Sequence, residues 1–293
     1  MTPQEYCQDK TAASGSSFYY SFLFLPADTR RAITALYAFC REVDDVVDEC
    51  HEVSVAQQKL DWWRDEISRA FAGKAQHPVC IELQRLIPEY GLEQDLFAEI
   101  INGMQMDLQQ SRYASLDELK QYCYRAASVV GLLSARLFGY ADDATKTYAH
   151  DLGMAFQLTN IIRDVKEDAL RDRIYLPQDM MQQFDVDESS LSADTTSPQL
   201  KRLLGELTEH TDEYYQSAMQ ALPESDRWNQ RSGLIMSAIY HAVLERIRKN
   251  DFDVLRGRTS LPTLAKLWIA WRTARTESKR HRRYQKTLSH HAA

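Results

Sequence analysis

Two pairs of aspartates, each spaced four residues apart, are the part of the sequence best suited to chemistry. Asp44 and Asp48 lie in CREVDDVVDEC, and Asp164 and Asp168 lie in FQLTNIIRDVKED, about 120 residues later. Like charges four residues apart on a helix cost roughly 0.2–0.5 kcal/mol per pair, so a positive partner is needed to compensate them. Mg²⁺ takes oxygen ligands, usually one or two carboxylates together with substrate phosphates. The spacing therefore predicts two sites for Mg²⁺, or for Mn²⁺ in its place, each beside a phosphate group.

The first pair continues an apolar face of a predicted helix. At about 100° per residue, Tyr37, Arg41, Asp44 and Asp48 fall within a stripe about 60° wide. A solvated run of charges would lie on the opposite side of the helix. Asp45 lies about 100° off the stripe, so we rank it below its neighbours as a ligand.

The second pair belongs to a similar stripe. Gln157, Asn160, Asp164 and Asp168 share one side of a predicted helix, next to an apolar face and away from a charged one. Carboxylates at the edge of an apolar face are costly unless they have partners. This seam of amides and carboxylates is therefore expected to border a cavity.

Arginines accompany both pairs: Arg41 precedes the first, and Arg163, Arg171 and Arg173 surround the second. Guanidinium groups bind phosphate oxygens through two parallel hydrogen bonds. A metal–diphosphate site between apolar helices favours ionisation of an allylic diphosphate to a carbocation. Aromatic faces would stabilise the cation, and a dry pocket would protect it from water. The candidate wall residues, each of a type that is more often ordinary core, are Phe18, Phe22, Tyr37, Tyr122, Val130, Leu133, Leu137 and Phe156.

The elements that position these residues are predicted to be helices. Glycine and proline together make up about 6% of the 293 residues, against a usual share near 12%. Spacings of i, i+3 and i+4 predict helices over 29–50, 55–71, 78–89, 92–109, 115–138, 142–168, 200–221 and 231–251. Asp28 is the predicted N-cap of the first helix, and 184–199 is a predicted surface connection or lid. No linker separates two cores, so residues 1–293 are expected to form one all-α domain.

Composition excludes several classes of protein. A formal charge of -7 argues against binding to nucleic acid. Five cysteines without a CxxC pair suggest reduced thiols, and neither a signal peptide nor a membrane span is recognisable, which predicts a cytoplasmic protein. The chain from about residue 272 is basic. It could touch an anionic leaflet at the inner face of the membrane, although a solvated, frayed tail is the simpler interpretation.

Three segments extend these patterns into a resemblance. SGSSFYYSFLFLPADTRRAITALYAFCREVDDVVDE, YCYRAASVVGLLSARLFGY and AFQLTNIIRDVKEDALRDRIYLPQDM resemble the squalene and phytoene synthases, which join two prenyl diphosphates head to head. The similarity extends from Ser14 to about Lys266 and is strongest to the bacterial presqualene diphosphate synthases of hopanoid and squalene biosynthesis. It implies an isoprenoid-synthase fold, a single all-α bundle around a central cavity.

The resemblance also implies roles for individual residues. Asp44 and Asp48 would hold Mg²⁺ at one diphosphate, and Asn160, Asp164 and Asp168 would hold it at the other. Tyr122 matches a tyrosine linked to cation stabilisation and proton handling, and Gln157 matches a polar residue of the cavity. The residues expected to bind diphosphate are Ser17, Arg41, Asn160, Arg163, Arg173, Tyr240 and Arg258.

The implied reaction joins two molecules of farnesyl diphosphate into presqualene diphosphate. No NADPH is expected, and the product would pass to downstream squalene-forming enzymes. Squalene, dehydrosqualene or phytoene synthesis on the same scaffold remains an alternative, because chain length depends on a few residues at the cavity floor. A non-catalytic assembly factor is a third interpretation. It gives no reason to keep all four aspartates and their arginines.

Overall fold

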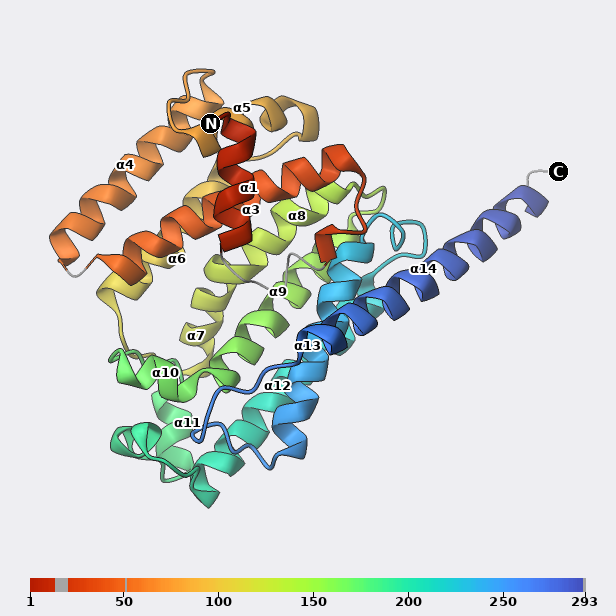
Figure 1. Ribbon diagram of the computed structural model, residues 1–293. Helices are drawn as coiled ribbons and strands as arrows, with labels where there is room; N and C mark the ends of the chain where they lie inside the picture. The colour runs from red at the N-terminus through yellow and green to blue at the C-terminus, as the bar shows by residue number, and fades with distance from the viewer. Residues whose placement is uncertain (14–20, 51, 292–293) are drawn as a thin grey trace.

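A computed structural model describes residues 1–13, 21–50 and 52–291 and confirms the predicted all-α class (Figure 1). These residues contain one isolated β-bridge, between Arg112 and Ile174, and no strand. The predicted site residues Ser17 and Phe18 lie outside the described ranges. In chain order the helices are α1 (Pro3–Ala13), α3 (Ala27–Glu49), α4 (Val53–Phe71), α5 (Pro78–Tyr90), α6 (Gln94–Gln109), α7 (Leu116–Cys123), the π-helical turn η1 (Tyr124–Ser128), α8 (Val129–Phe138), α9 (Ala144–Arg163), α10 (Val165–Leu170), α11 (Gln178–Gln183), the 3₁₀ turn η2 (Glu188–Ser192), α12 (Pro198–Ala221), α13 (Arg231–Lys249) and α14 (Thr263–His291).

Local sequence signals set several of these boundaries. Ser115 accepts a hydrogen bond from the backbone N–H of Glu118 at the start of α7, and Ser197 caps α12 in the same way. α5 ends at Gly91, whose φ of 60° lies in the left-handed region that glycine adopts without strain. The predicted cap of α3 is wrong: Pro26 is the N-cap, and Asp28 lies inside the first turn.

Two predicted helices are interrupted where they approach the centre of the molecule. The segment 115–138 contains the π-helical turn η1 between α7 and α8. The segment 142–168 breaks at Asp164, whose φ and ψ of -103° and 16° end α9 and begin α10. The predicted connection at 184–199 also contains a 3₁₀ turn, in which Leu191 is buried.

α9 lies at the centre of the bundle and packs against α7, η1, α8, α12 and α13 (Figure 1). Two glycines bring it into backbone contact with the helices before it. A Cβ on Gly153 would lie 2.5 Å from the Cα of Ser128, and one on Gly131 would lie 2.5 Å from the carbonyl oxygen of Ala149. Neither contact leaves room for a side chain. The close approach fixes the position of the amide and carboxylate seam at the end of α9.

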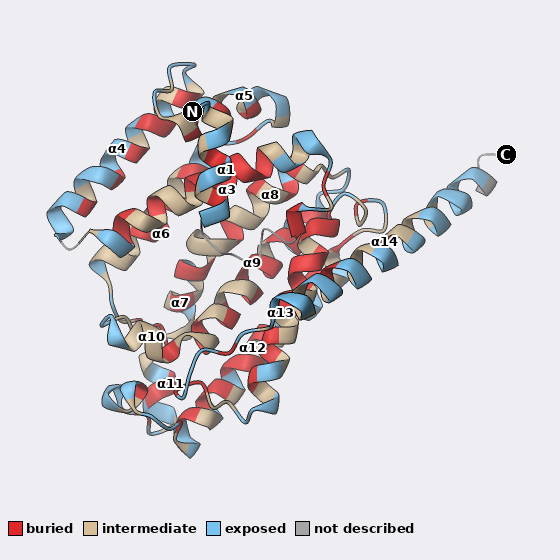
Figure 2. Cartoon of the chain, viewed as in Figure 1, coloured by how far each residue is buried: buried red, intermediate tan, exposed pale blue. Residues whose placement is uncertain are grey.

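The buried side chains form two large clusters on either side of α8, and a third, small cluster joins α13 to α14. One large cluster is built mainly by α3, α4, α5 and α6, and the other by α7, α9, α11, α12 and α13. Figure 2 shows buried residues running through the centre of the bundle and exposed ones over the outer faces of α4 and α14. α14 leaves the body of the molecule and ends far from it (Figure 1). The expectation of a frayed basic tail is wrong, because 272–291 continues this helix.

Candidate active site

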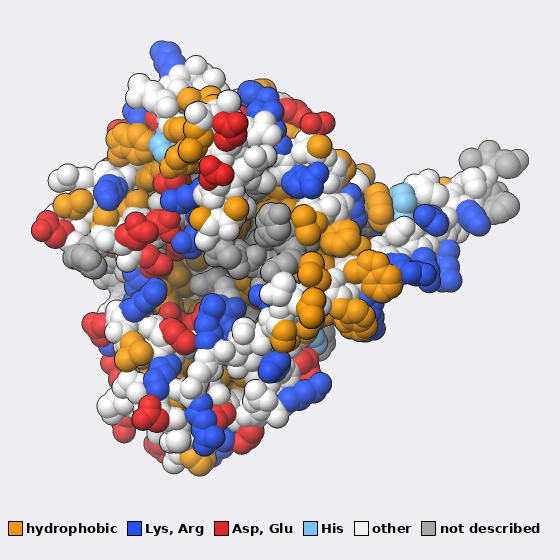
Figure 3. Space-filling model, in the orientation of Figure 1, with side chains coloured by type: hydrophobic (Ala, Val, Ile, Leu, Met, Phe, Trp, Pro, Cys, Tyr) orange, Lys and Arg blue, Asp and Glu red, His pale blue; other side chains and the backbone are white. Residues whose placement is uncertain are grey.

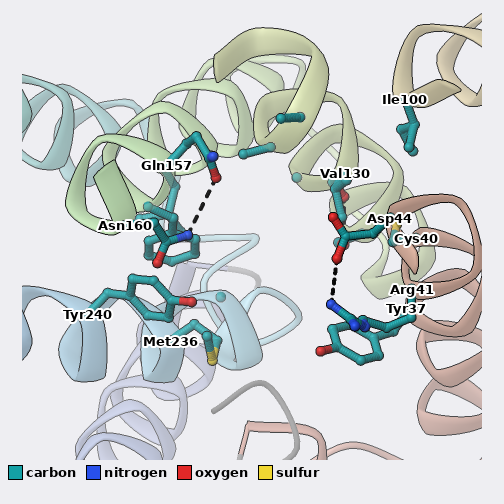
Figure 4. A pocket seen from close by; sticks show the side chains of 18 of the residues that line it. Tyr37, Cys40, Arg41, Asp44, Ile100, Val130, Gln157, Asn160, Met236 and Tyr240 are labelled. Carbon is teal, nitrogen blue, oxygen red and sulfur yellow. Dashed lines mark hydrogen bonds and ion pairs between the residues drawn. The ribbon is translucent and has the colours of Figure 1, made fainter. Parts of the chain in front are cut away.

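A cavity of about 500 Å³ opens between the two large clusters. Its wall is formed by α3, α6, η1, α8, α9 and α13, so segments far apart in sequence meet there. Figure 4 shows α3 presenting Tyr37, Arg41 and Asp44 across the space from Gln157 and Asn160 of α9. Met236 and Tyr240 of α13 close the side next to Asn160. The cavity is therefore apolar over much of its wall and charged at one end.

The stripe predicted on α3 is confirmed. Tyr37, Arg41, Asp44 and Asp48 all line the cavity. The Arg41 guanidinium donates to Asp44 Oδ2 at 2.5 Å. Asp45 is not part of the lining, as its position off the stripe suggested. Its carboxylate contacts Lys10 Nζ at 2.8 Å and also pairs with the Arg41 guanidinium. A straight helix keeps residues four apart on one side, which is why the stripe calculated at about 100° per residue agrees with the structure here.

The second seam also lines the cavity, even though the helix that carries it is broken. The backbone N–H of Asp168 donates to the carbonyl oxygen of Asp164 at 2.9 Å, which keeps the two residues about one turn apart across the break. Asp164 accepts from Arg163 Nε at 2.7 Å and from Arg258 Nε at 2.8 Å. Two of the predicted diphosphate-binding arginines therefore hold one carboxylate at the edge of the cavity.

Arg173 connects the surroundings of the two acidic pairs. Its guanidinium donates to Asp48 Oδ1 at 3.0 Å and to the carbonyl oxygen of Val47 at 3.2 Å. Its backbone N–H donates to the carbonyl oxygen of Asp168, also at 3.0 Å. Arg171 Nη1 lies 3.8 Å from Asp48 Oδ2. Both arginines line the cavity, so two cations lie beside the first acidic pair at its charged end.

Burial makes some of these carboxylates costly to ionise. Burial raises the pKa of Asp44 to about 6, against an opposing effect of Arg41. Burial, together with the nearby charges of Asp164 and Asp107, raises the pKa of Asp168 to about 7. Burial acts in the same direction at Asp164, but Arg163 and Arg258 outweigh it and hold the pKa of that carboxyl below its usual value. Negative charge is in excess around Asp44 and Asp168, where a further cation would relieve it.

The sequence interpretation missed a third acidic element, the carboxylate of Asp107. Asp107 lines the cavity from α6 and accepts from Tyr175 Oη at 2.8 Å and from Tyr122 Oη at 3.0 Å. The rings of Tyr122 and Tyr175 stack with centroids 5.0 Å apart. Burial raises the pKa of Asp107 to about 7, although both hydroxyls and Arg173 oppose the shift. A signal for it exists: Asp107 shares a helical stripe with Ile100 and Met104, and all three line the cavity.

Only some of the remaining predicted wall residues line the cavity. Phe22, Val130 and Phe156 line the cavity together with Tyr122, Gln157 and Tyr240. Leu133 and Leu137 do not and are buried in the cluster of α3 to α6. The lining face of α8 follows Val130, Ser134 and Phe138, and Leu133 lies about 60° to one side of Val130. The assignment of Leu133 to the cavity is therefore wrong.

The donor set at the charged end fits a hard divalent cation. The amide oxygen Oδ1 of Asn160 is buried and has no hydrogen-bond partner, while its Nδ2 donates to Gln157 at 3.4 Å (Figure 4). Carboxylate and amide oxygens are ligands that Mg²⁺ accepts. Within 1–13, 21–50 and 52–291, however, no three His, Cys, Asp or Glu side chains form a group that could hold a metal ion alone. Bound substrate phosphates would have to complete the coordination of a metal here.

The described residues contain further features that bear on the sequence predictions. All five cysteines are free thiols, as expected. Among the residues that the structure describes, no helix is both long enough and apolar enough to cross a bilayer.

Comparisons of the sequence and of the structure with known proteins point to the same family. The sequence profile of squalene/phytoene synthase matches residues 11–265. The chain is 33% identical to the 15-cis-phytoene synthase of Synechococcus elongatus over 90% of this chain and 89% of the relative. A dehydrosqualene synthase structure superposes with a TM-score of 0.83 at 25% identity, covering 94% of this chain and 97% of that one. The squalene synthase HpnC of Alicyclobacillus acidocaldarius superposes with a TM-score of 0.78 at 27% identity, covering 86% and 95%.

Proposed function

The chain belongs to the squalene/phytoene synthase family, whose members condense isoprenyl diphosphates, and from this premise we propose that it joins two molecules of farnesyl diphosphate into presqualene diphosphate. In this reaction one molecule loses its diphosphate to give an allylic cation. The 2,3 double bond of the other attacks it, a new carbon–carbon bond forms, and loss of one proton closes a cyclopropane. One diphosphate and one proton leave, and the second diphosphate stays on the product.

One observation carries this proposal: two acidic seams, on α3 and at the junction of α9 and α10, line the same apolar cavity. One seam would suffice for a single diphosphate, whereas head-to-head coupling requires two diphosphates close together. Arg41 and Arg173 lie beside the first seam, and Arg163 and Arg258 lie beside the second. Each group can bind phosphate oxygens through guanidinium N–H donors.

We further propose that Mg²⁺, or Mn²⁺, binds at Asp44 and Asp48 and at Asn160, Asp164 and Asp168. When bound, the metal would neutralise the negative charge that develops on the departing diphosphate. The protein's own part is to hold the oxygen donors in place, and the buried, unpartnered Oδ1 of Asn160 supports this assignment. Arg163 and Arg258 keep Asp164 ionised and therefore ready to bind a cation.

The wall beyond the diphosphates has the properties needed to protect a carbocation. The aromatic rings of Phe22, Tyr37, Phe156 and Tyr240 contribute to it, and a cation is attracted to the face of such rings. Burial excludes water, which would otherwise capture the cation. Tyr122 lines the same cavity, and its hydroxyl donates a hydrogen bond to Asp107. We assign Asp107 as a positioning residue for Tyr122.

A second candidate is phytoene synthesis from geranylgeranyl diphosphate, favoured by the names of the sequence relatives. Two structural neighbours, at 25% and 27% identity, are named for dehydrosqualene and squalene, which are built from two fifteen-carbon units. We place farnesyl diphosphate first because these two structures are named for fifteen-carbon coupling products and because the sequence blocks quoted above resemble presqualene diphosphate synthases. No step of that reaction is a reduction, so no NADPH is needed.

The deciding experiment incubates the purified protein with farnesyl diphosphate and Mg²⁺, with and without NADPH, and identifies the products by mass spectrometry. A parallel incubation contains geranylgeranyl diphosphate. We expect presqualene diphosphate under both nucleotide conditions and little product from the longer substrate.

Each other result has a definite meaning. Squalene formed only with NADPH would show a complete squalene synthase, and product from geranylgeranyl diphosphate alone would show a phytoene synthase. Consumption of neither substrate, by a protein that is folded by circular dichroism, would support the non-catalytic interpretation.

A further inference from the structure

The outward face of α14 carries a stripe of exposed hydrophobic side chains. Leu264, Leu267, Trp268 and Trp271 follow the i, i+3, i+4, i+7 spacing and point to one side of the helix. Their exposed fractions are 80%, 39%, 54% and 51%. Figure 3 shows hydrophobic side chains gathered over the part of α14 nearest the body. Isolated exposed hydrophobic residues are ordinary, but two tryptophans and two leucines in one stripe are not.

The same side of the helix becomes cationic beyond Trp271. Arg275, Lys279, Arg282 and Lys286 are exposed and fall within the same sector, which is about 120° wide. Figure 3 shows Lys and Arg side chains along the projecting part of the helix. The arginines also reach back, with the guanidinium of Arg275 lying 5.3 Å from the centre of the Trp271 ring. We call Leu264, Leu267, Trp268, Trp271 and these four cations the outward stripe.

The opposite side of α14 is fixed to the protein. Ala270 is fully buried against α13, and Glu277 forms an ion pair with Arg227 at 2.7 Å. Arg280 donates to Glu224 at 2.7 Å, so it does not belong to the outward stripe. These contacts determine the rotation of the helix about its axis. The outward stripe must therefore face away from the body.

We propose that the outward stripe is a docking surface for an anionic lipid bilayer, with the two tryptophans and two leucines in the interfacial layer and the cations on the headgroups. Charge supports this occupant over a protein groove. α14 contains eight lysines and arginines and one glutamate, in a chain whose net charge is -7, so the cations are concentrated on this helix. Tryptophan and arginine are characteristic of interfacial helices, and each cation near an anionic surface contributes to binding.

Shape supports the same occupant. From Leu264 to Lys286 the stripe is about 33 Å long on one continuous helix, at 1.5 Å per residue. A projecting helix with one uniform face fits a flat surface along its whole length. This inference does not depend on the proposed reaction, because it concerns a face of α14 and not the cavity.

The test is co-sedimentation of the full chain with vesicles of phosphatidylcholine alone or containing 30% phosphatidylglycerol. One variant carries Trp268→Ser and Trp271→Ser, and its matched control carries Trp62→Ser at an exposed tryptophan of α4. A second variant carries Arg275→Gln, Arg282→Gln and Lys286→Gln. Its control carries Lys59→Gln, Lys74→Gln and Lys146→Gln, which make the same change in net charge at positions that are exposed on other parts of the chain. Circular dichroism verifies that all four are folded.

We expect the wild-type chain to bind the anionic vesicles and to bind phosphatidylcholine alone at least about tenfold more weakly. The tryptophan variant should lose about tenfold or more in partitioning. The charge variant should lose about 100-fold in low salt, and this difference should shrink strongly in 0.5 M NaCl. Both controls should bind like the wild type.

Several results would overturn the proposal. It is wrong if the wild-type chain binds neither kind of vesicle, or if the stripe variants bind as well as their controls. Equal binding to both vesicle types would remove the electrostatic component. If light scattering instead shows a dimer that the tryptophan variant abolishes, while vesicles capture nothing, the stripe is a contact between two copies of this chain.

Discussion

At the scale of single residues, Asp164 and Asp168 lie one helical turn apart, yet their surroundings act on a negative charge in opposite ways. Asp164 is held by Arg163 and Arg258, which lower its pKa below the usual value despite its burial. At Asp168, burial and the nearby charges of Asp164 and Asp107 outweigh the effect of Arg173 and Arg171, and its pKa is raised to about 7. The two carboxylates therefore contribute to stability with opposite signs in the absence of a metal.

This difference predicts opposite effects of two isosteric substitutions. Because the folded pKa of Asp168 lies above the unfolded value of about 3.9, its ionisation lowers stability as the pH rises from about 4 through 7. At pH 8 without Mg²⁺, Asp168→Asn should raise the melting temperature by about 2 °C or more. Asp164→Asn should lower it, because Arg163 and Arg258 lose a charged partner whose stabilisation is present at high pH and is lost as the pH falls through the depressed pKa.

Differential scanning calorimetry of the two variants and the wild type measures these shifts. Both variants, and Asp44→Asn as well, should remain folded and turn over very slowly at any Mg²⁺ concentration. Shifts of the same sign for the two variants would contradict the assigned electrostatics. Near-normal turnover in any of the three would remove the metal role from that residue.

Asp107 gives a second prediction at the residue scale. Asp107→Asn retains the shape of the side chain but removes the charge that accepts hydrogen bonds from Tyr122 and Tyr175. We expect kcat to fall about 100-fold, because Tyr122, the residue assigned to proton handling, loses the partner that positions it, and we expect less than about a threefold change in KM. Steady-state kinetics with the substrate identified above measures both.

The matched control is Asp151→Asn. Asp151 is a buried carboxylate on the same helix as the seam, hydrogen-bonded to His150 and Ser217, and it does not line the cavity. An equal loss of kcat in this control would show a general structural effect. A rise in KM at unchanged kcat in Asp107→Asn would assign Asp107 to substrate binding instead.

At the scale of elements, the backbone contact between α9 and η1 determines where the second seam lies. Gly153→Ala would place a Cβ 2.5 Å from the Cα of Ser128, so one helix must shift. Such overpacking usually costs about 1–3 kcal/mol. We expect a lower melting temperature together with reduced kcat, because the seam moves with the helix. The control Gly205→Ala on α12 meets only the ring of Phe252 at 3.9 Å and should be neutral or up to about 1 kcal/mol more stable.

Urea denaturation monitored by circular dichroism separates the two glycine variants. If Gly153→Ala were as stable and as active as the wild type, the tight contact would not control the site. If Gly205→Ala were destabilised equally, the effect would be a general property of alanine in these helices.

The elements also show which parts of the site could be predicted from sequence. The stripe of Tyr37, Arg41, Asp44 and Asp48 follows from helical geometry because α3 is unbroken. Periodicity within 142–168 did not reveal the break at Asp164, where Arg258 from a distant segment donates to the carboxylate. Tertiary contacts override local pattern in such places.

Two individual side chains were not predicted correctly, for the same reason. Leu133 fits the expected wall by residue type, but the lining face of α8 is set by its packing against α3 and α6, which places it in the core. Asp107 shares the stripe of Ile100 and Met104, but a single carboxylate carries little weight until Tyr122 and Tyr175 are brought to it from other segments. The aspartate pairs were recognisable because the same four-residue spacing occurs twice, and that spacing is suited to binding a divalent cation.

At the scale of the whole molecule, the cavity separates two hydrophobic clusters that are joined across its charged end by Arg173. A substrate analogue bound there with Mg²⁺ should therefore stabilise both sides together. At 100 times its Kd a ligand stabilises the folded state by about 2.7 kcal/mol. With a thiolo analogue of farnesyl diphosphate, which ionises slowly, we expect amide hydrogen exchange to slow both at 41–49 of α3 and at 163–173 around α10.

This double protection is specific to a ligand that engages both acidic seams. The analogue without Mg²⁺, or Mg²⁺ alone, should protect less than the two together, because oxygens from the protein and from the diphosphates complete the coordination jointly. Exchange along the projecting part of α14 should not change, since that helix does not line the cavity. Protection confined to α3 or to 163–173 would mean that only one diphosphate site is formed, and a single site cannot bring two prenyl diphosphates together for coupling.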